Sequence, residues 1–387
     1  MKPTAGTIGP LRVHNPSMKY DKWHFLSVGA QWDRDTVPIF EAAARGRCVP
    51  LLKTLLTSRC TNDCSYCEFR FGRRIQRQSW KEHKLAKITM QLWKQREITG
   101  LFLTSSVFKD PDYITERQLT VLRMLREAGY TGYIHLRLMP GVSKGYIREA
   151  VELADRLGIN LEAPTADSFS ILCPNKGDYR QAVLKRLEWV VDEVKRARNR
   201  RLENKYGFGR SGVDTQMIVG ALGDNDWQHL ETTVRLYEGL GLRRVFYSAF
   251  KPIENTPLED RHPCPSYRER RLYQCSFLVR DYGFKLKDFV DLVDDEGFLP
   301  NVDPKILFVK RNPVLFPVDL NEASYYDILK IPRVGPVTAR KIIAARNRRE
   351  IRCFSDLENV VGPCLAHTIA PYIHLKEKRL TYFLKIT

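Results

Sequence analysis

Cys60, Cys64 and Cys67 lie within eight residues of one another, directly after an apolar run. Their C-x3-C-x2-C spacing supplies three thiolates to one small inorganic site and leaves out a fourth. Structural zinc is normally held by four protein ligands. A four-iron cluster can be held by three cysteines, because its fourth iron can bind a small molecule through an amine and a carboxylate. The spacing therefore favours a 4Fe–4S cluster with one open position.

Two other interpretations of these cysteines stay open at this stage. They could form a zinc knuckle whose fourth ligand is Cys48, His83 or Cys173, or they could be three unlinked thiols of the core. Iron–sulfur clusters absorb at about 400 nm. Loss of iron and of this absorbance on replacement of any one of the three cysteines would separate the interpretations.

The segments around the cysteines alternate between strand-like and helix-like patterns. The strand-like runs are residues 51–57, 100–104, 133–138, 159–162, 215–220 and 244–250. Apolar residues recur at helical spacing in residues 82–96, 115–128, 145–157, 179–198 and 227–240. Repeated strand and helix imply an α/β fold with a parallel sheet and helices outside it. The cysteine loop follows the first strand, at the edge of the sheet where such folds carry their chemistry.

Tyr66 precedes the last of the three cysteines, and this arrangement resembles the signature of the radical S-adenosylmethionine (SAM) enzymes. The resemblance implies a partial (β/α)6 barrel, a 4Fe–4S cluster on Cys60, Cys64 and Cys67, and SAM on the open iron, with Tyr66 beside the cofactor. In that family one electron cleaves SAM, and the 5′-deoxyadenosyl radical removes a hydrogen atom from the substrate. An electron donor such as flavodoxin or ferredoxin is implied as well.

The resemblance also suggests which residues contact SAM. Thr104, Ser105 and Ser106 stand where the family has a Gly-Gly-Glu-like turn that contacts the methionine amino group. Because the residue types differ, only backbone contacts are expected there. Glu162, in the segment NLEAPT, resembles the position that binds the ribose or the methionine end. A carboxylate at this place could equally cap a helix or pair with Arg137.

The segment QMIVGALGD, residues 216–224, is similar to the family's fifth strand. There an apolar residue and a glycine let the backbone approach adenine, which assigns adenine contacts to Gln216, Val219 and Gly220. A glycine after a strand is otherwise mostly a turn residue. The adenine contact is therefore expected from the position of Gly220 in the barrel.

The second informative segment is residues 321–346, NEASYYDILKIPRVGPVTARKIIAAR. Helical periodicity stops at Pro332, Gly335 permits a tight turn, and helical spacing then resumes. This order resembles the helix-hairpin-helix DNA-binding module, in which backbone N–H groups face phosphate oxygens. The resemblance assigns nucleic-acid contacts to Arg333, Val334, Gly335, Thr338, Arg340 and Lys341. Arg333 replaces the module's usual first glycine, which could distort the hairpin or add a phosphate contact.

The charge of the chain also favours a polyanionic partner. The 387 residues include 63 Lys and Arg against 45 Asp and Glu, a formal net charge of +18. Residues 304–387 contain 15 Lys and Arg against 7 Asp and Glu, and a weaker second hairpin pattern covers residues 354–370. The alternatives are a hairpin that serves only packing and a charge that serves only solubility. Binding through phosphates would depend strongly on salt and little on base sequence.

Nearly the whole chain from Pro50 onward resembles one group of radical SAM proteins that is assigned to DNA modification or repair. These proteins end in a helix-hairpin-helix and are associated with a uracil-DNA-glycosylase-like partner; the segments GLFLTSS, YIHLRLMPG, NLEAPT and YSAF carry the match. The resemblance implies an N-terminal extension (1–47), a partial radical SAM barrel (48–300) and an all-α helix-hairpin-helix domain (301–387).

The function expected from these features is radical modification or repair of DNA bases. One alternative is modification of RNA such as tRNA, since phosphate contacts discriminate poorly between the two polymers. Another is a non-catalytic, DNA-bound iron–sulfur sensor or a scaffold for a repair partner. No apolar run approaches the roughly 18 residues of a membrane span. Nine cysteines and the lack of a secretory signal pattern favour a reducing cytoplasm.

Overall fold

The computed structural model describes residues 39–44 and 47–376. The predicted N-terminal extension, residues 1–47, therefore lies almost entirely outside the described residues. Contacts divide the chain into two compact units, one made of Met1–Ala221 with Leu240–Pro263 and the other of Leu222–Gly239 with Cys264–Thr387. The first unit contains the large sheet and the second is mainly helical.

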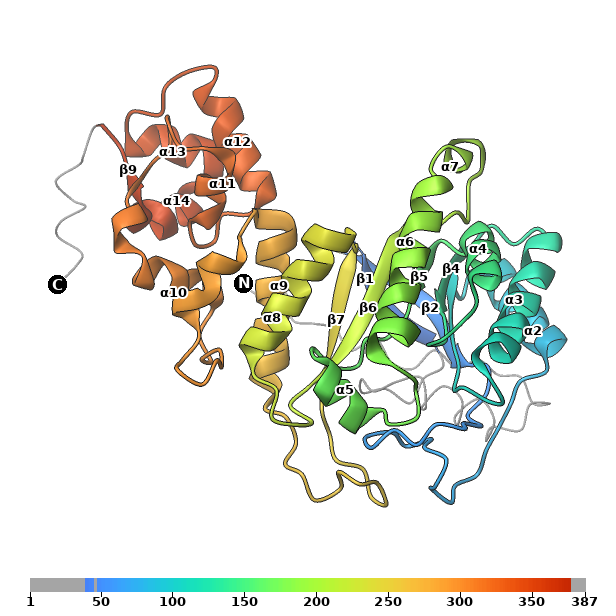
Figure 1. Ribbon diagram of the computed structural model, residues 1–387. Coiled ribbons are helices and arrows are strands. Elements are labelled where there is room, and N and C mark those ends of the chain that lie inside the picture. The colour runs from blue at the N-terminus through green and yellow to red at the C-terminus, as the bar shows by residue number, and fades with distance from the viewer. Residues whose placement is uncertain (1–38, 45–46, 377–387) are drawn as a thin grey trace. The chain divides into compact units, whose positions relative to one another are not determined.

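The first unit is organised by a seven-stranded sheet whose strand order is the order of the sequence (Figure 1). Six strands are parallel, and the first is antiparallel to its neighbour. The strands are β1 (Ile39–Ala44), β2 (Arg47–Leu55), β3 (Gly100–Thr104), β4 (Tyr133–Arg137), β5 (Arg156–Gly158), β6 (Gly212–Val219) and β7 (Arg244–Ala249). The six parallel strands curl into a half-barrel, which confirms the predicted α/β partial barrel.

Helices cover the outer side of this sheet (Figure 1). They are α2 (Glu82–Lys94), α3 (Pro111–Glu127), α4 (Lys144–Leu153), α5 (Ala166–Leu172), α6 (Lys185–Arg196), which continues a π-helical turn (Tyr179–Leu184), and the short α7 (Arg200–Glu203). The aliphatic side chains of the strands pack beneath them, and Leu101, Leu103, Ile134 and Leu136 are fully buried. Burial of this apolar surface is the main force that holds helices and sheet together.

Two strands differ from the sequence-based expectation. β1 was not predicted. The strand expected at residues 159–162 is found earlier, at β5, which begins within the segment 145–157 that was expected to be helical. The reason is Asp155. Its carboxylate accepts hydrogen bonds from the backbone N–H groups of Ile134 and Gly207 and pairs with Arg126, so the chain leaves α4 at Ala154 and turns into the sheet.

Gly158 permits an ion pair to cross β5 on the inner face of the sheet. Arg137 Nη1 on β4 lies 2.6 Å from Asp214 Oδ1 on β6, and both side chains are buried. A Cβ atom at Gly158 would overlap both partners. The absence of a side chain therefore joins β4 to β6 across the strand between them.

The second unit consists of helices with one short parallel strand pair. Its helices are α8 (Asp226–Arg235), α9 (Ser266–Tyr282), α10 (Pro304–Arg311), α11 (Tyr325–Lys330), α12 (Pro336–Arg346), α13 (Phe354–Val361) and α14 (Pro363–Ile369). The strands are β8 (Val318–Asp319) and β9 (Ile373–His374). Contacts assign α8 and α9 to this unit, whereas the predicted domain boundary lay at residue 300. That boundary stays a prediction, because a division by contacts does not test which segments fold independently.

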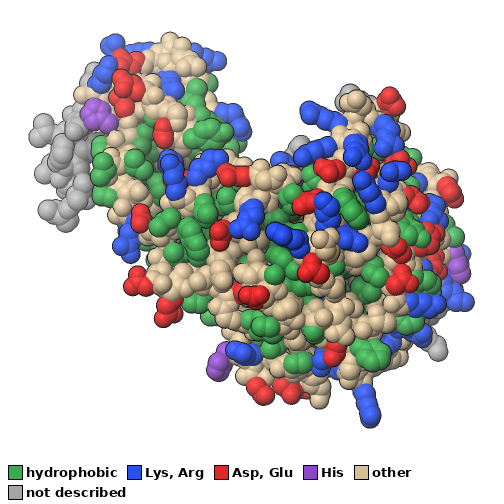
Figure 2. All heavy atoms as spheres, in the orientation of Figure 1, with side chains coloured by type: hydrophobic (Ala, Val, Ile, Leu, Met, Phe, Trp, Pro, Cys, Tyr) green, Lys and Arg blue, Asp and Glu red, His purple; other side chains and the backbone are tan. Residues whose placement is uncertain are grey.

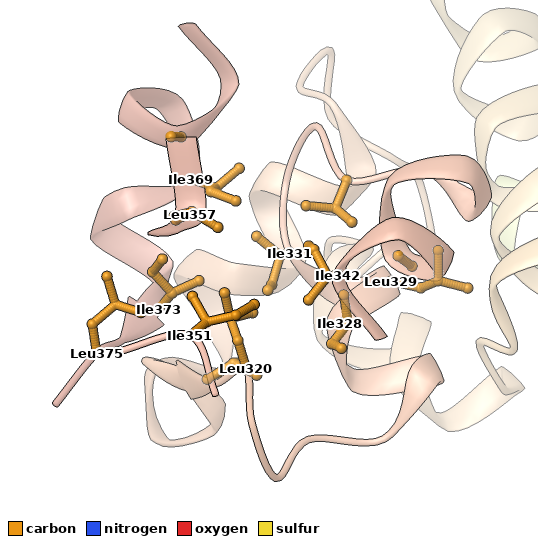
Figure 3. Close-up of a cluster of buried hydrophobic side chains, with 14 of the residues drawn as sticks. Leu320, Ile328, Leu329, Ile331, Ile342, Ile351, Leu357, Ile369, Ile373 and Leu375 are labelled. Atoms are coloured by element: carbon orange, nitrogen blue, oxygen red, sulfur yellow. The ribbon is translucent and has the colours of Figure 1, made fainter. Parts of the chain in front are cut away.

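The core of the second unit lies between two consecutive helical hairpins (Figure 3). α11 and α12 form the first around a turn at residues 331–335, and α13 and α14 form the second around Gly362, whose φ is +87°. Ile328, Ile331 and Ile342 of the first hairpin are buried with Leu357 of the second. The predicted order of helix, turn and helix is thus present twice.

Within the described ranges, no helix is both long enough and apolar enough to span a membrane.

Candidate functional site

The cysteine loop joins β2 to α2 and is fastened to its neighbours by backbone hydrogen bonds. Thr61 N–H donates to Val107 O (2.7 Å), which ties the loop to the segment after β3. Ser65 N–H donates to Leu172 O (2.8 Å) and Ser65 Oγ to Ile171 O (2.9 Å), which ties it to the end of α5. The loop is therefore held at the carboxyl edge of the parallel strands, where it was expected.

Hydrogen bonds from the side chain of Arg77 hold the same loop together. Its guanidinium donates to four backbone carbonyl oxygens, those of Ser58 (2.8 Å), Phe69 (2.6 Å), Arg70 (2.7 Å) and Arg73 (3.1 Å). These acceptors lie on both sides of the cysteine segment. The Arg77 side chain thus supplies hydrogen-bond donors to backbone carbonyl oxygens that have no partner in a helix or sheet, because the loop is irregular.

The three cysteines differ in environment. Burial raises the pKa of Cys67 to about 12 and also raises the pKa of Cys60. The pKa of Cys64 is instead lowered to about 7, chiefly because the Cys173 thiol donates a hydrogen bond to it. Cys60 feels the charge of Cys64, and Cys67 feels the charges of both Cys64 and Cys60. They therefore form one electrostatic group, with Cys64 the most readily ionised.

The zinc alternatives are distinguished by the same geometry. His83 is exposed on α2, the side chain of Cys48 lies outside the described residues, and Cys173 is beside Cys64. Among the side chains that are described, no three His, Cys, Asp or Glu gather tightly enough to hold one metal ion. A multi-iron cluster places several metal ions and sulfides between its cysteines, so the thiolates need not meet at one ion.

The donor set fits an iron–sulfur cluster. The three loop residues are free thiols, and Phe69 N–H donates to Cys67 Sγ (3.4 Å). Hydrogen bonds to sulfur and nearby positive charge are the means by which proteins stabilise such clusters. The Arg77 charge contributes here, since it interacts with both Cys60 and Cys67.

Glu162 is the most constrained of the predicted cofactor residues. It follows β5 with a φ of +65°, in the left-handed region that non-glycine residues rarely adopt. Only 2% of the residue is exposed, and its Oε1 lies 2.6 Å from Nζ of the half-buried Lys176. Of the alternatives weighed from the sequence, pairing with Arg137 is wrong, because Arg137 pairs with Asp214.

The backbone of Glu162 is fixed by β6. Glu162 N–H donates to Gln216 O (2.9 Å), and Glu162 O accepts from Ile218 N–H (2.8 Å). Val219 is fully buried and Gly220 has a φ of +76° directly after the strand. The fold therefore brings Glu162, Gln216, Val219 and Gly220 to one edge of the sheet, and their contact with a cofactor stays a prediction.

The remaining predicted cofactor residues also lie at this edge. Thr104 ends β3, and its carbonyl accepts from Leu56 N–H (2.8 Å), while Ser106 N–H donates to Thr57 O (3.0 Å). Ser105 is half-buried and its hydroxyl donates to Ser106 O. Tyr66 lies close to Glu162, and burial raises the pKa of its hydroxyl well above the usual range. Several of the backbone groups expected to face SAM are thus already engaged within the protein.

The inner face of the sheet carries a charged cluster that sequence patterns did not identify as a site. Asp214 Oδ2 lies 3.0 Å from His135 Nε2 in addition to its contact with Arg137, and the His135 ring stacks on Phe102 at 4.1 Å between centroids. Burial opposes ionisation, but Arg137 and His135 hold the pKa of Asp214 at about 2. Lys53 belongs to the same cluster, with its Nζ 5.6 Å from the centroid of the Phe102 ring.

In the second unit, the six predicted nucleic-acid contacts gather at the turn and first helical turns of the α11–α12 hairpin. Arg333, Arg340 and Lys341 are exposed, Gly335 and Thr338 are half-buried, and Val334 is buried. Gly335 caps α12 without any side-chain hydrogen bond, so the first N–H groups of this helix lack an intrahelical acceptor. Figure 2 shows further Lys and Arg side chains on the surface of the hairpins.

Lys305 is a residue of this region that sequence reasoning missed. Only 8% of it is exposed, and its Nζ donates to Val334 O at the hairpin turn (2.6 Å). Burial lowers its pKa to about 7, although Asp303 opposes the shift. A lysine in the first turn of an amphipathic helix is normally a surface residue, so no signal in the sequence could have found it.

Comparison with known proteins gives similarity of fold only. No family model matches the chain, and no curated protein matches it in sequence. Among solved structures, methylornithine synthase (PylB) is 16% identical with a TM-score of 0.44, over 58% of this chain and 60% of that one. The FeFe-hydrogenase maturase HydG from Carboxydothermus hydrogenoformans is 14% identical with a TM-score of 0.44, over 58% of this chain and 50% of that one. A further HydG structure, described as a maturase of the [FeFe]-hydrogenase, is 12% identical with a TM-score of 0.44, over 81% and 74%. The chain thus spans less than two thirds of the length of the first two.

Proposed function

We propose that this protein is a radical SAM enzyme that acts on nucleic acid, with DNA base modification or repair as its reaction class. The observation that carries the proposal is the cysteine loop. Three free thiols with C-x3-C-x2-C spacing are held by Arg77 at the carboxyl edge of a six-stranded parallel half-barrel. Ligand sites of parallel α/β sheets lie at this edge.

Cys60, Cys64 and Cys67 hold a 4Fe–4S cluster, and SAM completes the site. When bound, these groups supply a one-electron cleavage of SAM and a 5′-deoxyadenosyl radical that removes a hydrogen atom from the substrate. Cysteine binds metal in its thiolate form, and the hydrogen bond from the Cys173 thiol favours that form at Cys64 by lowering its pKa.

The chain positions the cofactor through backbone and carboxylate groups. Glu162 offers a buried carboxylate whose backbone is locked to β6, and Gly220 leaves the end of β6 open for close approach of a planar ring. Lys176 orients the Glu162 carboxylate, because its Nζ lies 2.6 Å from Glu162 Oε1.

The second unit binds the polyanion. Exposed Arg333 lies just before the N-terminus of α12, which has no side-chain cap and suits an anion, and exposed Arg340 and Lys341 follow in the second turn of the helix. Contacts of this kind are made to phosphate and carry little base information. A uracil-DNA-glycosylase-like protein, suggested by the family resemblance, is proposed as a partner.

The enzymatic part is tested by anaerobic reconstitution, reduction and measurement of 5′-deoxyadenosine, with and without duplex DNA. We expect release that DNA stimulates and that Cys64→Ala abolishes. A fully loaded cluster without any 5′-deoxyadenosine would contradict catalysis and favour a DNA-bound iron–sulfur sensor or scaffold.

The nucleic-acid part is tested separately by competition between duplex DNA and tRNA at fixed salt. Preference for DNA supports the proposal, and preference for tRNA would move the substrate class to RNA. Binding that does not weaken as salt rises would contradict phosphate recognition altogether.

A further inference from the structure

Two exposed apolar side chains lie beside the cysteine loop. In the described part of the first unit, Phe71 and Ile171 are the only large hydrophobic residues that are more than half exposed, at 69% and 57%. Phe71 N–H donates to Asn62 O (2.8 Å), and Ile171 O accepts from Ser65 Oγ (2.9 Å). Both residues are therefore fastened to the cysteine loop itself. Exposed apolar groups that gather in this way mark interaction sites.

The charge beside these side chains is positive. Residues 59–77 contain five arginines and two acidic residues. Both acids are already paired with arginines of the same segment, at 2.6 and 3.8 Å. Exposed Arg59 and Arg74 have no carboxylate within ion-pairing distance among the side chains that the structure describes. The loop therefore presents uncompensated positive charge, which attracts an acidic partner over a distance.

Apolar and positive groups together suit a protein partner better than a nucleic acid. The core of a protein–protein interface is apolar and its rim is polar, whereas interfaces with nucleic acid are polar and strongly positive. An aliphatic side chain such as Ile171 has no favourable contact to make with phosphate oxygens. Transient redox complexes bury less than about 1,200 Å2, so two apolar side chains and a few charges are enough for such a contact.

The reaction needs an electron from outside the chain, because reductive cleavage of SAM consumes one. Cys60 and Cys67 are only half-buried, so the cluster that they would hold lies close to this surface. We propose that Phe71, Ile171 and the two unpaired arginines form the docking surface for a small acidic electron carrier. One electron leaves the reduced carrier and enters the cluster, and no bond is made or broken. This proposal rests on the radical SAM function proposed above and specifies a partner of that site.

The test measures binding of an oxidised, acidic flavodoxin to the reconstituted full chain by calorimetry, so that no electron is transferred. Phe71→Ser/Arg74→Glu removes an apolar contact and reverses one charge. We expect the affinity to fall at least tenfold, because loss of a central apolar contact and of a charge pair commonly weakens a complex by this factor. Ile171→Ser, which lies outside the cysteine loop, should weaken binding as well. Higher salt should weaken binding to the natural protein.

The matched control is Lys87→Glu/Met124→Ser. It makes the same kinds of change on α2 and α3, at an exposed lysine and at a methionine that is 38% exposed. Dithionite, a small reductant, needs no docking surface and shows whether the cluster of each variant is intact. All variants should react with dithionite at the same rate. Reduced flavodoxin should reduce the control normally and the Phe71→Ser/Arg74→Glu protein more slowly.

The outcomes separate this inference from the proposed function. Equal affinity of the natural protein and of Phe71→Ser/Arg74→Glu would overturn the inference. So would failure of both a flavodoxin and a ferredoxin to bind protein whose cluster dithionite reduces with release of 5′-deoxyadenosine. A variant that loses affinity for duplex DNA but keeps it for flavodoxin would assign the surface to nucleic acid and would also overturn the inference. A cluster that does not form, or that releases no 5′-deoxyadenosine when dithionite reduces it, would overturn the proposed function as well.

Discussion

Lys176 Nζ lies 2.6 Å from Glu162 Oε1, with Glu162 buried and Lys176 half-buried, and both charges act on Cys64 and Cys173. Each partner comes from an irregular segment, since Glu162 follows β5 and Lys176 follows α5. The pair therefore links the carboxyl edge of the sheet to the turn against which the cysteine loop is docked.

Removal of one partner of this pair should be costly. Lys176→Met leaves a buried carboxylate without its counter-ion, which typically costs about 3 to 5 kcal/mol of folding free energy. The double variant Glu162→Gln/Lys176→Met should recover part of that loss. Urea unfolding of the single and double variants gives the coupling free energy.

The matched control for this cycle is the exposed pair Lys185–Glu188, whose atoms are 3.1 Å apart. Exposed pairs contribute about 0.2 to 1 kcal/mol. Equal coupling energies in the two cycles would show that burial of the Glu162 pair has no energetic consequence.

Arg77 should control how firmly the cysteine loop holds iron. Arg77→Met removes the donors to four carbonyl oxygens, each worth about 1 kcal/mol. Loss of even two should speed iron release by roughly tenfold or more. Release from reconstituted protein is followed with a coloured iron chelator. Arg74→Met, which alters an exposed arginine of the same segment, is the control; identical rates in both variants would contradict the bracing role.

Gly158→Ala should disrupt the half-barrel. The new Cβ would overlap Arg137 Nη1, Asp214 Oδ1 and the Asp214 backbone, none of which can move freely in a buried pair. We expect loss of several kcal/mol, as is usual for overpacking combined with a broken buried ion pair. The soluble yield and the denaturation midpoint are measured.

Gly145→Ala provides the comparison, because nothing lies within 4 Å of a Cβ at Gly145 in α4. Alanine in a helix interior is more stable than glycine by about 1 kcal/mol. A Gly158→Ala protein as stable as the Gly145→Ala protein would contradict the close approach.

Lys305 should make stability depend on pH. Its pKa is about 7 in the folded protein, against 10.5 ordinarily, and the groups that face it are Asp303, the Tyr282 ring of α9 and the carbonyl of Val334. At pH values between 7 and 10.5, Lys305 carries a proton in the unfolded chain that it lacks in the folded chain. The free energy of unfolding therefore rises with pH across this range. Below pH 7 both states are protonated and the full cost of burial remains.

The measurement is urea unfolding of the natural protein and of Lys305→Met at several pH values from 6 to 10 under reducing conditions. The difference between them should grow by about 1 kcal/mol per pH unit through the window from 7 to 10.5. Parallel curves would show that Lys305 titrates normally.

The exposed cations of the α11–α12 hairpin should set the salt dependence of nucleic-acid binding. Arg340→Gln/Lys341→Gln removes two exposed positive charges in the second turn of α12. Each lost phosphate contact lowers the slope of log affinity against log salt by about 1. Arg235→Gln in α8 is the control, and an unchanged slope in the double variant would place the phosphates elsewhere.

The amino-acid sequence by itself determined the cysteine loop, five of the six parallel strands and the two helical hairpins. These features are local. Cys60, Cys64 and Cys67 are neighbours in the chain, a strand or helix shows its period within a few residues, and Pro332 and Gly362 end helices wherever they stand. β5 was misplaced because its position depends on Asp155, whose partners Ile134 and Gly207 are far from it in sequence.

Only the tertiary structure decided which charged groups meet. Glu162 pairs with Lys176 across 14 residues, Lys305 reaches Val334 across 29, and Arg137 reaches Asp214 across 77. Charged residues show no periodic pattern in the sequence that would reveal which residues they pair with. The Arg137–Asp214 pair can form only because Gly158, between them, has no side chain.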